Sequence, residues 1–255
     1  MQLNYKTFGQ GDPIIILHGL FGMLDNWQTL AKKLAENYSV FIVDQRNHGR
    51  SPHVGEHNYT GMADDLLHFM QDHLMQKAHI IGHSMGGKTA MQFAFDHPDQ
   101  VDKLIVVDIA PKTYPAGHNE IFNALEALDL EQLENRRAID EQLSRFVPEQ
   151  GVKQFLMKNI ERTKNNGFAF KMNFPVIHRD YPDILEAPEW DEPFEGDTLF
   201  IRGANSHYVQ DEDVLDILES FPNARLETIF DAGHWVHAEK PQELLDLVKE
   251  FLAAT

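Results

Sequence analysis

The sequence contains no cysteine, which excludes several classes of protein and site. Without thiols there are no disulfide bonds, no thiolate metal sites and no cysteine nucleophile. Long apolar runs are missing as well, so no transmembrane helix is predicted and no membrane partner is expected. The segment Met1–Pro13 lacks the basic and apolar regions of a secretory signal, and this favours a cytoplasmic protein.

Basic residues are scarce: 22 lysines and arginines stand against 40 acidic residues, for a net charge of -18. Such a surface repels nucleic acid, so none is expected as a partner. The 14 histidines raise the question of a metal site. However, no His-x-x-x-His pair lies in an expected helix beside a carboxylate, and His48, His53 and His57 fall in a polar loop. We therefore predict no metal and no cofactor.

The 255 residues, 42% hydrophobic and 24% charged, suit one large domain better than two domains with separate cores. Short apolar runs alternate with helical patterns, which is typical of an α/β fold with a mostly parallel sheet and helices on both faces. The expected strands are Leu3–Phe8, Pro13–Leu17, Val40–Val43, His79–Ile81, Lys103–Val107, Thr198–Ile201 and Leu226–Phe230. The expected helices are Trp27–Glu36, Met62–Gln76, Met85–Phe95, Glu212–Glu219 and Gln242–Leu252.

The strand–helix alternation breaks between about residues 112 and 195. Apolar residues recur there at helical spacing, in Ile121–Leu133 and Val152–Ile160. In open α/β sheets, ligands bind at the carboxyl edge of the strands. We therefore predict a single domain over residues 1–255, with a helical cap inserted at about 112–195 above that edge.

The five residues Gly82-His83-Ser84-Met85-Gly86 follow an expected strand and precede an expected helix. This is the G-x-S-x-G nucleophile elbow in the strand–turn–helix context that it requires. Ser84 must stand on a sharp, strained turn, so that only very small residues fit two positions before and after it. Gly82 and Gly86 meet this requirement, and the pattern predicts that Ser84 is a nucleophile.

Three further motifs accompany the elbow: His18-Gly19-Leu20-Phe21-Gly22, Asp44-Gln45-Arg46-Asn47-His48-Gly49-Arg50-Ser51 and Asp231-Ala232-Gly233-His234. Together with the elbow, they resemble the α/β-hydrolase family. The combination of Val107-Asp108-Ile109-Ala110-Pro111 with Arg202-Gly203-Ala204-Asn205-Ser206 is most similar to the YbfF-type bacterial esterases. In the second motif, Asn47 stands where glycine is commoner in the family. The resemblance covers nearly the whole chain outside the cap and implies an α/β-hydrolase fold.

A serine hydroxyl needs a base, and His234 follows the last expected strand, in the chain order that this fold uses. We predict that His234 is a general base toward Ser84 and then a general acid toward the leaving group. The resemblance implies that the backbone N–H groups of Met85 and Leu20 form the oxyanion hole, with Phe21 as a substitute for Leu20.

The acid of the triad departs from the common pattern of the family. A Gly-x-x-Asp loop ordinarily supplies it, and here that loop ends in Ser206. Asp108 follows the neighbouring strand, and YbfF-type esterases are understood to use this position. We assign Asp108 as the acid and Ser206 as an auxiliary hydrogen-bond donor. Asp211 and Asp213 are rivals, although both suit the start of the following helix better.

The substrate pocket is expected between the elbow and the cap. Candidate lining residues are Phe21, Met23, Met85 and Trp235, with some of Phe168, Phe170 and Phe174, and they imply an acyl group of modest size. The stretch 145–179 carries seven basic and two acidic residues, so its net charge is +5. It suggests attraction of an anionic ester or thioester, such as an acyl-coenzyme A, unless it is only a solvated helix face.

These observations predict a serine hydrolase that cleaves carboxylic esters or thioesters through an acyl-enzyme, as a monomer or homodimer. The alternatives are a carbon–carbon bond hydrolase or perhydrolase on the same fold, or a non-catalytic ligand-binding protein. A dehalogenase or epoxide hydrolase is disfavoured, because those enzymes carry aspartate where Ser84 stands.

Overall fold

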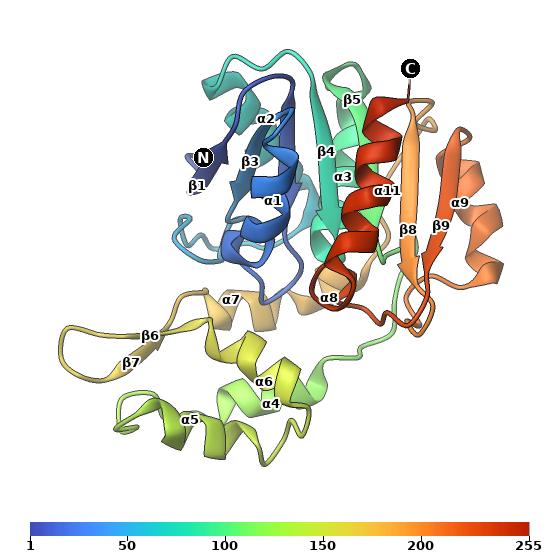
Figure 1. Ribbon diagram of the computed structural model, residues 1–255. Helices are drawn as coiled ribbons and strands as arrows, with labels where there is room; N and C mark the ends of the chain where they lie inside the picture. Colours follow the sequence, from blue (N-terminus) through green and yellow to red (C-terminus); the bar gives the residue numbers. More distant parts are fainter. Residues whose placement is uncertain (255) are drawn as a thin grey trace.

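A computed structural model describes residues 1–254 as a seven-stranded sheet covered by helices on both faces (Figure 1). The strand order is β1-β3-β2-β4-β5-β8-β9, and only β1 runs antiparallel to its neighbour. This confirms the predicted fold class. The strands are β1 (Tyr5–Phe8), β2 (Pro13–Leu17), β3 (Ser39–Val43), β4 (Ala78–His83), β5 (Val101–Val107), β8 (Thr198–Gly203) and β9 (Ala224–Ile229).

The central strands are buried on both faces, which explains why they are continuous apolar runs. On one face, Ile14 and Ile16 pack with α1 (Gln28–Leu34) and α11 (Pro241–Ala253). On the other face, Ile15 and Leu17 pack with α2 (Tyr59–Asp72) and α3 (Met85–Asp96). The helices around the sheet are η1 (Leu24–Trp27), α1 (Gln28–Leu34), α2 (Tyr59–Asp72), α3 (Met85–Asp96), η2 (Pro98–Gln100), η3 (Asp211–Asp213), α9 (Val214–Ser220), α10 (Val236–Glu239) and α11 (Pro241–Ala253). Within residues 1–254, no helix is both long and apolar enough to cross a bilayer.

Between β5 and β8 the chain leaves the sheet and forms a separate layer, which lies below the carboxyl ends of the strands in Figure 1. We call this layer, residues 112–195, the insertion. It has its own apolar cluster, which also includes Leu20 and Met85 of the sheet domain. Its elements are α4 (Asn119–Glu126), α5 (Arg136–Leu143), α6 (Gln150–Met157), β6 (Ile160–Arg162), β7 (Phe168–Phe170), α7 (Phe174–Arg179) and α8 (Tyr181–Leu185).

Several expected elements differ from the observed ones. The helix expected over Trp27–Glu36 begins one residue later, because Leu24–Trp27 forms a tighter 3₁₀ turn. The helical pattern of Ile121–Leu133 stops at Glu126, after which the chain turns. The antiparallel pair β6–β7 was not expected, since two strands of three residues are too short to show an alternating pattern.

Candidate active site

Ser84 occupies the turn between β4 and α3 with φ 53° and ψ -120°, a left-handed conformation that side chains rarely adopt. The glycines around it are required by close packing. A Cβ on Gly82 would lie 2.2 Å from the carbonyl oxygen of Gly86, and one on Gly86 would lie 2.5 Å from that of His18. The strained elbow that the motif predicts is therefore present, and its glycines let the turn pass between neighbouring backbones.

A chain of hydrogen bonds joins the three residues that the sequence singled out. The Ser84 Oγ lies 3.1 Å from Nε2 of His234, and Nδ1 of the same ring lies 2.7 Å from Oδ2 of Asp108. Ser84 is 8% exposed and Asp108 is fully buried. The order hydroxyl, imidazole, carboxylate is the arrangement in which a serine is activated for nucleophilic attack.

Three groups donate hydrogen bonds to the buried carboxylate of Asp108. The backbone N–H of Gly203 donates to Oδ1 at 3.0 Å, while Ser206 Oγ, at 2.5 Å, and His234 Nδ1 donate to Oδ2. The residue itself has φ 54°, which aspartate tolerates better than most residues. Ser206 therefore contacts the carboxylate and not the imidazole. The rival Asp213 pairs with Lys112 at 2.5 Å.

The His-Gly loop, residues 18–22, lies directly against the elbow. A Cβ on Gly19 would come within 3.2 Å of the Cβ of Ser84. His18 holds this loop in place: its Nδ1–H donates to the carbonyl of Gly19, and its Nε2 accepts from the N–H of Gln45. Burial lowers the pKa of His18 to about 4, so the ring is neutral and serves the loop structurally.

Backbone amides in this loop and at the elbow are free to face a substrate. Within residues 1–254, the N–H groups of Leu20, Phe21 and Met85 make no hydrogen bond. Phe21 has φ 59°, and the side-chain amide of Asn159 in the insertion donates to its carbonyl oxygen. The insertion therefore helps to hold the loop in a strained conformation.

Tyr208, which no motif in the sequence singles out, packs against His234 and connects it to residues of the insertion. The ring of Tyr208 stacks on the imidazole, with centroids 3.9 Å apart and an interplanar angle of 20°. Its hydroxyl lies 3.4 Å from Nε2 of His118, whose Nδ1 is 2.7 Å from the hydroxyl of Tyr181. Burial lowers the pKa of His118 to about 4, so this ring is neutral. No motif marks these residues: Tyr208 lies in the loop between β8 and η3, whereas His118 and Tyr181 belong to the insertion, so only the folded chain brings them together.

His83 directly precedes Ser84 in the elbow and makes a specific contact with His234. Its Nε2–H donates to the carbonyl oxygen of His234 at 2.8 Å and so fixes the backbone of that residue. Burial, with a smaller effect from His234, keeps the pKa of His83 well below its ordinary value. His48, His53 and His57 lie in the loop between β3 and α2, as the sequence suggested. His48 and His57 are buried, whereas His53 is exposed.

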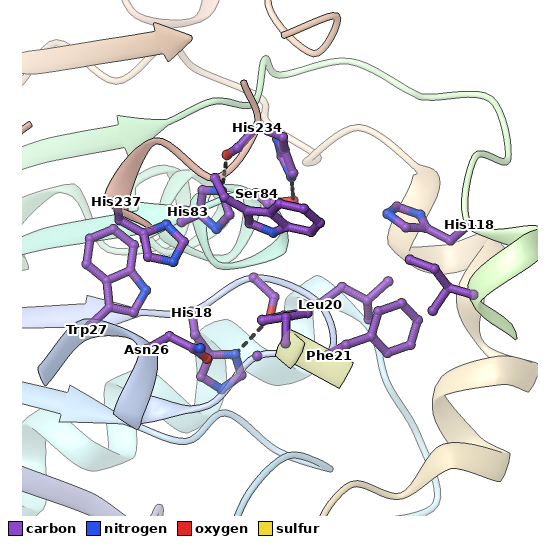
Figure 2. A pocket seen from close by; sticks show the side chains of 15 residues that line it. His18, Leu20, Phe21, Asn26, Trp27, His83, Ser84, His118, His234 and His237 are labelled. Atoms are coloured by element: carbon purple, nitrogen blue, oxygen red, sulfur yellow. Dashed lines mark hydrogen bonds between the residues drawn. The ribbon is translucent and has the colours of Figure 1, made fainter. Parts of the chain in front are cut away.

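Two narrow cavities meet at Ser84, and both are also lined by Leu20 and His118. Cavity 1, about 40 Å³, lies on the side of His234 (Figure 2). Its wall consists of His18, Gly19, Leu20, Phe21, Gly22, Asn26, Trp27, His83, Ser84, His118, Ile121, Phe155, His234, Trp235 and His237. Cavity 2, about 30 Å³, is lined by Leu20, Tyr59, Ser84, Met85, Lys88, Ile109, Tyr114, His118, Tyr181, Ile184, Leu185 and Tyr208.

The structure places some of the predicted pocket residues at the two cavities and others elsewhere. Phe21 and Trp235 line cavity 1, and Met85 lines cavity 2. Met23 does not: it lines a separate surface hollow with Asn4 and Arg50. Other expected aromatic residues, Phe168 and Phe174, are buried in the apolar cluster of the insertion.

The fold, the elbow and the serine–histidine–carboxylate array define the class of the protein as a hydrolase of the α/β type. Residues 12–241 match the model of the alpha/beta hydrolase fold family, so the chain belongs to this family. It is also similar to several curated esterases and lipases over most of its length.

Esterase YbfF of Escherichia coli is 40% identical, over 94% of this chain and 92% of that protein. The sn-1-specific diacylglycerol lipase ABHD11 of Mus musculus is also 40% identical, over 94% of this chain and 80% of that one. The solved structure of a marine microorganism esterase superposes with a TM-score of 0.96 at 41% identity, covering 98% of this chain and 99% of the other. The resemblance to YbfF-type esterases is thereby confirmed, and the chain is an esterase of this family.

Proposed function

We propose that this protein hydrolyses carboxylic esters and thioesters of modest acyl groups through an acyl-enzyme formed on Ser84. The observation that carries the proposal is the bonded series of Ser84 Oγ, His234 and Asp108, at 3.1 and 2.7 Å. A serine in this arrangement becomes a nucleophile as its proton passes to the imidazole. The left-handed elbow keeps that hydroxyl clear of the sheet and directed at the two cavities.

In the first step, Ser84 Oγ attacks the substrate carbonyl and His234 Nε2 takes the hydroxyl proton. The imidazolium is stabilised through Nδ1 by the buried carboxylate of Asp108, which Ser206 and Gly203 hold in place. His234 then gives the proton to the leaving alcohol or thiol, and the C–O or C–S bond breaks. Water attacks the acyl-enzyme by the same route, with His234 as base, and releases the acid.

The negative charge of the tetrahedral intermediate needs hydrogen-bond donors beside the elbow. We assign the backbone N–H groups of Leu20 and Met85, which have no other partner within residues 1–254. Met85 is also the first residue of α3, where the helix dipole favours negative charge. Removal of one such donor costs about a hundredfold or more in kcat in serine hydrolases.

The cavities limit the substrate to slender groups on both sides of the scissile bond. Cavity 2 is lined mainly by apolar and aromatic side chains, and this favours an unbranched acyl chain of modest length. The mouse relative is named a diacylglycerol lipase, so short-chain glycerol esters belong in the first substrate panel.

Anionic thioesters are a second candidate class, supported by part of the basic stretch. Lys153 is buried and bonds to Ser144 and Asp140, and Arg179 pairs with Asp180, so these cations are already neutralised. Lys158, in contrast, is exposed. Lys158→Glu should reduce hydrolysis of an acyl-coenzyme A more than that of a neutral ester, and the difference should shrink at high salt.

The direct test is turnover of p-nitrophenyl butyrate, glyceryl butyrate and a butyryl thioester by the wild type and by Ser84→Ala. We expect the wild type to release butyrate from one or more of them and Ser84→Ala to lose that activity entirely. His97→Ala, a histidine substitution outside the site, is the control for general damage. Equal turnover in Ser84→Ala would refute the proposal.

A further inference from the structure

Cavity 1 has a polar end beyond the reacting residues, formed by Asn26, Trp27 and His237 (Figure 2). Trp27 is 1% exposed, and its indole Nε1 has no hydrogen-bond partner within residues 1–254. The imidazole of His237 stacks on the indole, with centroids 4.5 Å apart, and its Nδ1 is likewise unpartnered there. Figure 2 shows the indole nitrogen on the side of the ring that faces the cavity.

Buried polar groups without partners are costly, and their presence on a cavity wall points to a ligand atom that completes them. The indole N–H can only donate, so the missing partner must be an acceptor. Burial, with smaller effects from His234 and Lys158, lowers the pKa of His237 to about 3, and its ring is therefore neutral. No lysine or arginine lines cavity 1 among the described residues, so a carboxylate there would lack a counter-charge.

The side of the substrate that enters cavity 1 follows from the position of His234. As general acid, this residue must reach the leaving oxygen, and its side chain lines cavity 1 and not cavity 2. The alcohol portion therefore lies in cavity 1 and the acyl chain in cavity 2. This assignment rests on the proposed ester hydrolysis at Ser84.

We infer that the end of cavity 1 is a subsite for an uncharged oxygen acceptor (an ether, hydroxyl or carbonyl oxygen) in the alcohol portion of the ester. The Trp27 indole N–H donates to this oxygen, and the stacked ring of His237 fixes the orientation of the indole. Alcohols that carry such an oxygen are preferred over alkyl alcohols of equal length, because an alkyl chain leaves the buried N–H unpaired.

The test uses butyrate esters whose alcohols have five non-hydrogen atoms after the ester oxygen. Pentyl butyrate is the reference, and 2-ethoxyethyl, 3-methoxypropyl and 4-hydroxybutyl butyrate place one oxygen at successive positions. Each kcat/KM is divided by the rate of alkaline hydrolysis, which removes differences in intrinsic reactivity. We expect one or more oxygen-containing esters to exceed pentyl butyrate by about threefold to tenfold, the effect of one hydrogen bond.

The variants then assign the preference to the indole. The preference is the ratio of the corrected kcat/KM of an oxygen-containing ester to that of pentyl butyrate. Trp27→Phe should bring this ratio close to one. Trp190→Phe, the same change at a half-exposed tryptophan stacked on Phe95, should preserve it. If Trp27→Phe does not fold, replacement of Trp27 by 3-benzothienylalanine keeps the bicyclic shape and removes only the N–H. A ratio near one in the wild type, or a preference unchanged in both Trp27 variants, would overturn the subsite while leaving ester hydrolysis intact. Absence of turnover with every ester would instead refute the proposed function and the subsite with it.

Discussion

Replacement of Asp108 by asparagine tests the assignment of Asp108 as the acid of the triad. The asparagine side chain would keep the shape of the aspartate and tolerate the left-handed backbone at φ 54°. It would lose the charge that faces His234 Nδ1 at 2.7 Å. Loss of this carboxylate lowers kcat by about ten-thousandfold in the best-studied triad, and we expect a loss of about a thousandfold or more here.

Ser206→Ala should have a much smaller effect, although Ser206 occupies the common position of the acid. It removes one of three hydrogen bonds to the carboxylate, a charge-assisted bond worth about 1.5–3 kcal/mol to the folded protein. In Ser206→Ala, Asp108 keeps its hydrogen bonds to Gly203 and His234. Only part of the free energy of the missing hydrogen bond is therefore expected to raise the activation barrier. We expect kcat/KM to fall roughly tenfold.

The assay is the steady-state hydrolysis of p-nitrophenyl butyrate by Asp108→Asn, Ser206→Ala and the control Asp213→Asn. Asp213 is also buried but pairs with Lys112, so its substitution should leave kcat nearly unchanged. Circular dichroism of each variant checks that the fold is retained. The assignment of Asp108 as the acid would be refuted by a lower kcat in Ser206→Ala than in Asp108→Asn. It would also be refuted if Asp108→Asn kept more than about a tenth of the wild-type kcat.

Three further predictions concern groups around the site. Tyr208→Leu should lower kcat about threefold to tenfold by removing the ring stacked on His234, whereas Tyr208→Phe, which keeps the ring, should lower it less in the same assay. Asn159→Leu removes the hydrogen bond to the Phe21 carbonyl and should lower kcat more than it raises KM; a change in KM alone would contradict this role. Burial lowers the pKa of His48 to about 3, so below pH 6.5 the unfolded chain takes up a proton that the folded chain does not. His48 should therefore contribute a fall of up to about 1.4 kcal/mol per pH unit to the free energy of unfolding in urea between pH 6 and 4, in addition to the contributions of the other buried histidines. His48→Leu should make the measured slope shallower by up to that amount.

The sheet and the elbow were predictable because local chemistry determines them. Runs such as Pro13–Leu17 are apolar at every position. Because the side chains of a strand alternate between its two faces, such a run indicates a strand that is covered on both faces. The elbow permits only glycine where backbones pass closely, so Gly82 and Gly86 mark it in the sequence. The positions of Asp108 and His234 follow, because the carboxyl ends of parallel strands share one edge.

The walls of the cavities were not predictable in the same way. Tyr208 and His118 reach the site through loops and through the packing of the insertion, which leave no periodic pattern in the sequence. Met23 was assigned to the pocket because of its place in the chain, but the direction of its side chain depends on the turn that follows. In the sequence, Trp27 is only the first residue of an expected helix, and only the structure shows its unpartnered N–H at a cavity.

The central claim is that Ser84 forms a covalent acyl-enzyme, and the mass of the protein during turnover tests this claim most directly. Rapid acid quenching after mixing with p-nitrophenyl butyrate should trap protein heavier by one butyryl group, and peptide mapping should place this group on Ser84. Unmodified protein throughout an active time course, or a butyryl group on another residue with turnover retained in Ser84→Ala, would contradict the account.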